Sequence, residues 1–102
     1  MTEYRVIIPL SVRLYMDDIS DHIIAISRPE HAIRYIHEMI AEIRTLSYLA
    51  DALPYSQASF IKRIHPHGKR FNIKHGTWCI IFHIEQDYVI VDRIIPSSSV
   101  ID

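Results

Sequence analysis

The apolar residues of this chain change their spacing once, and that change limits the folds open to the chain. Between Val12 and Ala50 they recur every three or four residues, as they do along one side of an α-helix. From Lys69 onward they alternate with polar residues, which is typical of a half-buried β-strand. A helical part followed by a stranded part predicts an α+β fold in which helices pack on one face of a sheet.

Two helices are predicted in the first half of the chain, after a short strand. The strand is "EYRVII", and a proline soon ends it. A first helix is expected over residues 12–26. The segment from Ser27 to Glu30 matches the S-x-x-E capping box, with Pro29 in the first turn, so a second helix should start there. We expect this helix to end before Pro54.

Three further strands, "KRFNI", "TWCIIFHI" and "YVIVDRII", are expected to form a mostly antiparallel meander, which makes the order β-α-α-β-β-β. Residues 54–68 show no period and are expected to be a loop, or a loop with a short strand. One strand face should pack on the helical hairpin, with Phe71, Ile73, Trp78, Ile80, Phe82 and Ile84 against Ile19, Ile23, Ile36, Ile40 and Ile43. The other face should be uncovered and display Arg70, Asn72, Cys79 and His83.

The size and composition predict a single domain over residues 1–102, in which residues 97–102 form a short polar tail. The chain has 102 residues, 49% hydrophobic and 23% charged, which suits one packed core. A single cysteine excludes an internal disulfide and favours a reducing, cytoplasmic setting. No signal peptide and no run near the roughly 18 apolar residues of a membrane helix is present. We expect no cofactor, no metal and no membrane partner.

Positive charge is concentrated ahead of the most apolar strands. Five of the eleven Lys and Arg residues lie between residues 59 and 84, where there is no Asp or Glu, although the net charge is −1. These five residues are Lys62, Arg63, Lys69, Arg70 and Lys74. A cluster of this kind predicts contact with an anion, either a nucleic-acid phosphate backbone or the acidic residues of a protein partner. A merely solvated basic surface is the alternative.

The same stretch contains candidates for acid–base chemistry. Cleavage of RNA without a metal needs a base for the 2′-hydroxyl, an acid for the leaving oxygen and cations for the developing charge. Arg70 could supply charge, and His83 is the best-placed proton carrier because it shares a strand face with Cys79. The other candidates are Lys69 and Lys74 for charge, and His65, His67 and His75 for proton transfer. A strand histidine without a catalytic role is the alternative for His83.

The second helix has a wider apolar face than one stripe requires. Tyr35, Met39, Leu46, Leu49 and Leu53 extend this face over roughly half of the circumference. Two explanations are open. The helix contacts both the sheet and the first helix, or it leaves an apolar groove exposed for a partner.

The order and lengths of these segments resemble the RelE/ParE family of toxins from bacterial type II toxin–antitoxin systems. The similarity starts with "YRVII", continues through the hairpin broken at "SRPEHAIRYI" and is clearest in "KRFNIKHGTWCIIFHIEQDYVIVDRII". It implies the RelE/ParE toxin-like fold, with a helical hairpin on a small sheet. It also implies a cytoplasmic protein that inhibits growth and is neutralised by a cognate antitoxin protein.

The resemblance implies two kinds of target. RelE-like members cleave mRNA on the ribosome, and ParE-like members inhibit DNA gyrase. Arg70 keeps one cation of the RelE-like set, whereas Asn72 stands in place of a lysine and Cys79 in place of an arginine. A third interpretation is a family member that has lost catalysis and acts as a non-toxic binding or regulatory module.

The candidate site residues form three groups under this resemblance. The catalytic candidates are Arg70 and His83. The candidates for binding a target or nucleic acid are Lys62, Arg63, Lys69, Asn72, Lys74 and His75. The candidates for binding the antitoxin are Tyr35, Met39, Leu46 and Leu49.

Overall fold

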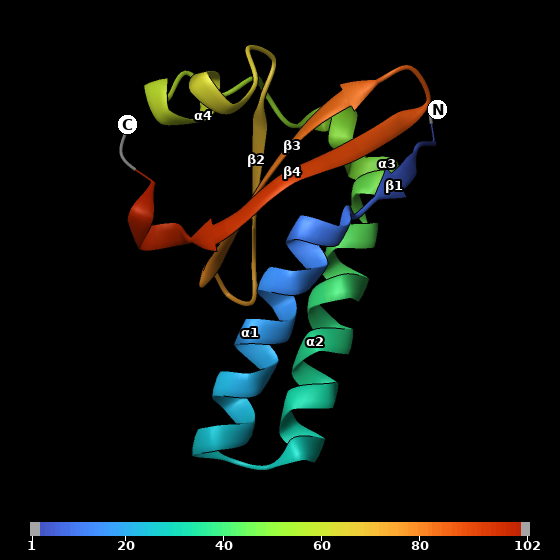
Figure 1. The fold of residues 1–102 in the computed structure, drawn as a ribbon. Helices are drawn as coiled ribbons and strands as arrows, with labels where there is room; N and C mark the ends of the chain where they lie inside the picture. The colour runs from blue at the N-terminus through green and yellow to red at the C-terminus, as the bar shows by residue number, and fades with distance from the viewer. Residues whose placement is uncertain (1–2, 101–102) are drawn as a thin grey trace.

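The chain begins with a short strand that leads into a long helical hairpin, and a sheet follows (Figure 1). The structure is a computed structural model, and it describes residues 3–100. Its elements are β1 (Arg5–Ile7), α1 (Leu10–Ile26), α2 (Pro29–Arg44), α3 (Leu46–Leu49), a 3-10 turn (Ala50–Ala52), α4 (Ser59–Ile64), β2 (Lys69–Ile73), β3 (Trp78–Glu85), β4 (Tyr88–Pro96) and a 3-10 turn (Ser97–Ser99). The expected β-α-α-β-β-β order is confirmed, with α4 as an addition.

The four strands form one sheet in the order β1-β4-β3-β2. β2 pairs with β3, and β3 with β4, in antiparallel fashion, as a meander requires. β1 runs parallel to β4 at the edge of the sheet, with Val6 opposite Val89. The sheet is therefore mostly antiparallel, and the α+β fold class is confirmed.

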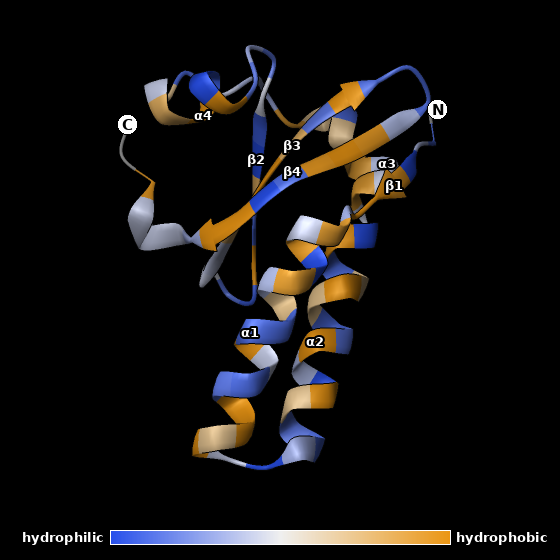
Figure 2. Ribbon diagram, viewed as in Figure 1, coloured by the Kyte–Doolittle hydropathy of each residue, from blue (hydrophilic) through white to orange (hydrophobic). Residues whose placement is uncertain are grey.

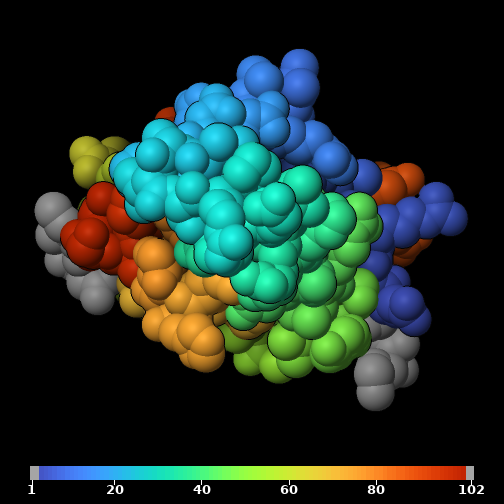
Figure 3. Space-filling view, turned by 90° about the horizontal axis from the view of Figure 1, so that it is seen from below, coloured from blue at the N-terminus to red at the C-terminus, as the bar shows by residue number. Residues whose placement is uncertain are grey.

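The helical hairpin is attached to the sheet by the first turns of α1 and the last turns of α2, and the end that carries the α1–α2 turn projects away (Figures 1 and 3). All three buried residues of α1, which are Val12, Met16 and Ile19, lie in the part nearer the sheet. Toward the α1–α2 turn several large apolar residues are exposed instead, and 71% of Ile26 and 59% of Ile33 is accessible to solvent. Figure 2 shows the resulting apolar segments on the projecting part of both helices. No helix in residues 3–100 is long and apolar enough to cross a membrane.

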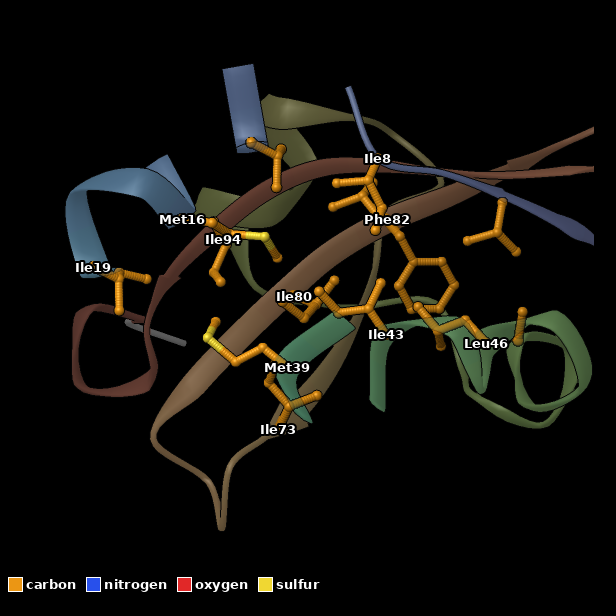
Figure 4. Close-up of a cluster of buried hydrophobic side chains, with 14 residues drawn as sticks. Ile8, Met16, Ile19, Met39, Ile43, Leu46, Ile73, Ile80, Phe82 and Ile94 are labelled. Carbon is orange, nitrogen blue, oxygen red and sulfur yellow. The ribbon is translucent and has the colours of Figure 1, made fainter. Parts of the chain in front are cut away.

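The main core lies between the hairpin and one face of the sheet (Figure 4). The predicted register is confirmed, because Ile73, Ile80 and Phe82 are buried in this core and Phe71, Trp78 and Ile84 pack at its margin. On the helical side, Ile19 and Ile43 are buried, and Ile23, Ile36 and Ile40 pack against them. The Trp78 indole donates a hydrogen bond to the Tyr35 hydroxyl at 2.9 Å and meets the Tyr15 ring edge-on.

Met39 and Leu46 also belong to this core, and neither has any exposed surface. Their expected role as antitoxin contacts therefore needs correction. The first explanation of the wide apolar face holds for these two residues, since α2 packs on α1 and on β2, and α3 packs on β1. Tyr35 and Leu49 are half-buried and keep part of their surface in solvent.

The predicted capping box at the start of α2 is wrong. The helix is preceded by Arg28 in an extended conformation, and no side chain caps it. The residue before a proline is driven to an extended conformation, so Pro29 moves the helix start past Ser27. The Ser27 hydroxyl pairs with Nδ1 of His31 at 2.5 Å instead.

The prediction of a loop over residues 54–68 is wrong, and so is the prediction of an uncovered second sheet face. Residues 59–64 form α4, which packs Ile61 on Cys79 and Ile81 in a second apolar cluster. Gly68 makes the close approach possible, because a Cβ atom there would lie 2.8 Å from Cγ2 of Ile61. A helix of six residues is too short to show a period and depends on tertiary contacts for its stability.

The expected polar tail is partly structured. Residues 97–99 form a 3-10 turn whose first amide donates to the Thr77 carbonyl at 3.0 Å. Val100 packs at the margin of the second cluster, which ties the end of β4 to the α4 side of the sheet. Residues 101 and 102 of the expected tail lie outside the described residues.

The burial of Met39 yields a test of the core. Replacing Met39 with alanine should lower the free energy of unfolding by about 2–5 kcal/mol, because the lost methylenes leave a cavity. The matched change Leu14→Ala, on the exposed side of α1, should alter it by no more than about 0.5 kcal/mol. Urea unfolding followed by circular dichroism measures both, and equal effects would contradict the assignment of Met39 to the core.

Candidate functional site

The candidate site lies on the sheet face that α4 partly covers. Across the β2–β3 pair, Arg70 is opposite Ile81 and Asn72 is opposite Cys79. Because directly opposed residues share a face, and residues two apart on one strand do as well, His83 lies on the same face as Arg70. The two catalytic candidates are thus on one face, as predicted, but only 8% of His83 is exposed.

His83 is held by a carboxylate that an irregularity in β4 brings to it. The register between β3 and β4 shifts after Ile81, so that Ile81 pairs with Arg93 and Phe82 with Val91. Asp92 is the extra residue of this β-bulge, a feature that redirects a side chain locally. Its carboxylate accepts a hydrogen bond from Nδ1 of His83 at 2.7 Å. Glu85 lies 3.4 Å from Nε2 on the other side of the ring.

One face of the His83 ring is covered by His65, the residue that directly follows α4. The two imidazoles are stacked, with centroids 3.8 Å apart and planes inclined by 6°. His67 is next, with its ring centroid 6.0 Å from that of His65 and 5.5 Å from that of Tyr55. His65 and His67 were predicted from the sequence as candidates for proton transfer. Tyr55 was not, because nothing in the sequence marks it beyond being an aromatic residue in a polar segment.

Lys69 does not contribute to the basic surface as expected, because only 6% of it is exposed. Its ammonium donates to the Ala50 carbonyl at 2.9 Å and lies 5.2 Å from the centre of the Tyr55 ring. Ala50 lies near the end of the helical run that α2, α3 and the 3-10 turn Ala50–Ala52 form. Burial lowers the pKa of Lys69, and the charge of Asp51 partly opposes this. Lys69 is therefore a link between β2 and the helical run, and its assignment to target binding needs correction.

Lys74 is also engaged within the fold. Its ammonium lies 2.6 Å from Glu38 of α2 and 4.4 Å from the centre of the Tyr35 ring. This ion pair holds the pKa of Glu38 below its usual value. The Lys74 amide donates to both carboxylate oxygens of Glu42. The β2–β3 turn is thereby bound to α2, and Lys74 is less available to a target than its position in the basic cluster suggested.

The other residues assigned to target binding have exposed side chains. Arg63, Arg70 and His75 are exposed, and so is Lys62, whose ammonium donates to Gln57 at 3.0 Å. Asn72 is exposed on the same strand as Arg70. Arg70 borders a pocket of about 570 Å³ that is otherwise lined by residues 54–58. The surface that the structure assembles is therefore built around Arg70 and the segment before α4.

Cys79 lies under α4 with no exposed surface. Burial raises the pKa of its thiol, and the charge of Arg70 opposes that effect only in part. A raised pKa keeps the thiol protonated, which does not favour a nucleophile. Within residues 3–100, no three His, Cys, Asp or Glu side chains converge as a metal site would require.

A second candidate surface lies on the projecting hairpin. A pocket of about 390 Å³ opens between α1 and α2 above Trp78, with Ile19, Ile23 and Tyr35 in its lining. A shallower groove of about 520 Å³ runs along the outer side of α2, past Ile33. Tyr35, a predicted antitoxin contact, therefore borders an open cavity.

The contact between His83 and Asp92 yields a test at the site. Asp92→Ala should lower the free energy of unfolding by about 1–3 kcal/mol, because a buried imidazole N–H loses its acceptor. The matched change Asp87→Ala removes an exposed carboxylate from the neighbouring turn and should have little effect. Urea unfolding at neutral pH compares them, and equal midpoints would show that the Asp92 carboxylate does not support His83.

Comparison with known proteins gives a fold. No protein-family model matches the sequence, and no curated protein matches it. The structure is similar to a chain of the chromosomal ParDE TA system from P. aeruginosa, with a TM-score of 0.72 and 14% sequence identity. The match covers 94% of this chain and 96% of that chain. The chain therefore has a ParE-like fold, as the resemblance of its sequence implied.

Proposed function

We propose that this chain is the toxin component of a type II toxin–antitoxin pair. It would inhibit growth by acting on a macromolecular target and would be neutralised by a cognate antitoxin. The observation that carries the proposal is the shared fold with the ParDE chain, which extends over nearly the whole length of both chains. A likeness of that extent concerns the whole domain rather than one motif.

The projecting hairpin supports a protein partner. Two helices packed only on each other cannot bury all of their apolar residues, and Ile24, Ile26 and Ile33 remain exposed there. Exposed apolar residues beside grooves are typical of protein interfaces. We assign the antitoxin contact to this surface together with Tyr35 and Leu49. Met39 and Leu46 support it from beneath.

For the target, we favour ParE-like inhibition of DNA gyrase over RelE-like cleavage of mRNA. Cleavage needs several cations and a proton carrier that converge on one phosphate. Here Lys69 is buried and Lys74 is paired with Glu38. His83 lies beneath His65. Arg70, with Asn72 beside it, is better suited to an interface contact with a protein target.

One observation favours the second candidate, a metal-free endoribonuclease. A histidine oriented by a carboxylate, as His83 is by Asp92, is a common arrangement for general acid–base catalysis. Arg70 on the same face would then stabilise the charge of the phosphorane. This alternative requires α4 to move, because His65 covers the ring that would have to reach the substrate.

The antitoxin surface can be tested by charge insertion. Ile33→Glu should abolish capture of the protein encoded by a short reading frame next to this gene, because a buried carboxylate without a partner is costly. Tyr88→Glu, at an exposed aromatic residue of β4, is the matched control and should leave capture intact. Co-expression and affinity capture, with circular dichroism of each variant, measure the outcome. Equal capture of both variants would place the antitoxin elsewhere.

The target proposal is tested by inducing the chain in cells and by two assays in vitro. Arg70→Ala should relieve growth arrest under either mechanism, whereas Arg28→Ala, at an exposed arginine of the hairpin turn, should not. If the chain cleaves RNA, the loss of Arg70 should cost about 2–4 kcal/mol of transition-state stabilisation. We expect the purified chain to inhibit gyrase supercoiling and to leave ribosome-bound mRNA intact.

His83→Gln separates the two mechanisms. The change should leave a gyrase inhibitor active and should abolish cleavage by a ribonuclease in which His83 is the acid or base. If the wild-type chain cleaves mRNA and the His83→Gln variant does not, the gyrase proposal is overturned. Absence of growth arrest by the folded wild-type chain would favour the non-toxic binding module.

A further inference from the structure

The ring of His65, directly after α4, stacks on His83 of the sheet. α4 has six residues, and its apolar contacts come from Ala58, Ile61 and two half-buried neighbours. A helix this short is not stable by itself, so its position depends on what holds its ends. At its C-terminal end, the amide of His65 donates to the Ile61 carbonyl, and the ring of His65 lies flat on His83.

The stacked geometry requires a neutral His65. The backbone amide of His67 donates to Nδ1 of His65 at 3.0 Å, so this nitrogen carries a lone pair and the ring proton is on Nε2. Protonation would place a hydrogen on Nδ1 and would remove the acceptor of that bond. The turn that leads from α4 to Gly68 would then lose this bond and keep the one from the Gly68 amide to the His65 carbonyl.

The charges around His65 make a proton there still less favourable. The groups that face it are His83 and Glu85 of β3, Asp92 of β4, and His67 of its own turn. Asp92 and Glu85 lie at the two ring nitrogens of His83. A proton on His65 would place a positive ring flat on the His83 ring, with the two centroids 3.8 Å apart. Burial, and next the charge of His83, lower the pKa of His65, while the two carboxylates oppose this.

We propose that the stacked His65–His83 pair is a pH-sensitive latch, which holds α4 on the sheet while His65 is neutral and releases it when His65 is protonated. When α4 is released, Cys79 and Ile81 are uncovered, and His83 becomes accessible on the face that carries Arg70. The latch goes beyond the proposed toxin function and does not depend on it.

The direction of the pH dependence follows from the lowered pKa of His65. The released state binds a proton on His65 at the ordinary pKa of 6.5, and the latched state binds it only at lower pH. The latch is therefore at full strength above about pH 6.5 and weakens as the pH falls below that value.

Cys79 is a built-in reporter of the latch, because it is the single cysteine of the chain and is buried under α4. The intact chain is treated with 4,4′-dithiodipyridine, a disulfide that reacts with thiols in acid as well as in neutral solution, between about pH 7.5 and pH 5. Labelling rates are divided by those of the urea-unfolded chain at each pH, which removes the intrinsic dependence of the reaction. We expect the normalised rate to rise several-fold as the pH falls, while the fluorescence of Trp78, on the opposite face, stays unchanged.

Two variants isolate His65. His65→Phe keeps a flat ring on His83 and lacks the Nδ1 acceptor at every pH, but it cannot be protonated, so its labelling rate should not change with pH. His75→Asn removes an exposed histidine from the β2–β3 turn and should keep the wild-type rise. Should His65→Phe fail to fold, the ring signals of His65 in the wild-type NMR spectrum decide, because their midpoint must lie below pH 6.5 and coincide with the midpoint of labelling. The latch would be overturned if the labelling rate of the wild-type chain did not change with pH, or if His65→Phe showed the same rise. It would also be overturned if labelling rose only after the Trp78 fluorescence was lost, or if the His65 midpoint were not shifted.

Discussion

The strand β3 is buried on both of its faces, and the rest of the structure is arranged around it. Five consecutive residues, from Cys79 to His83, have almost no exposed surface. Ile80 and Phe82 face the helical hairpin, and Cys79 and Ile81 face α4. A strand covered on both sides must be apolar throughout, which "CIIF" satisfies. The polar residue that follows, His83, must find hydrogen bonds inside the protein, and the bulge at Asp92 supplies one.

Burial also divides the basic cluster. Charges next to a packed sheet either find a partner or turn to solvent, because an unpaired charge is costly to bury. Lys69 reaches the carbonyl at the end of the helical run, and Lys74 reaches Glu38. These two contacts join β2 and its turn to the helices. Arg70 and the cations of α4 keep exposed side chains and form a smaller external surface. Under the proposed function, this surface suits one contact with a target better than a complete catalytic set.

The hairpin and the α4 face give the molecule two separate surfaces. The hairpin is held at one end by Met16, Met39 and their neighbours and projects beyond the sheet at the other. Its exposed apolar residues offer area to a folded or folding partner. The α4 face combines titratable rings with a small helix that few contacts hold. Under the proposed function, an antitoxin and a target would bind different parts of this domain, and a change at α4 need not disturb the hairpin.

The sequence by itself determined the α+β class, the order of the main elements and the register of β3, because each is written in the local spacing of apolar residues. It placed Arg70 and His83 on one face for the same reason. It did not reveal α4, whose six residues have no period and are stabilised by Ile81 and Cys79 from a distant strand. It also did not reveal the Asp92 bulge. Only the tertiary structure decided these features, since local spacing records which way a side chain points and not what it meets there.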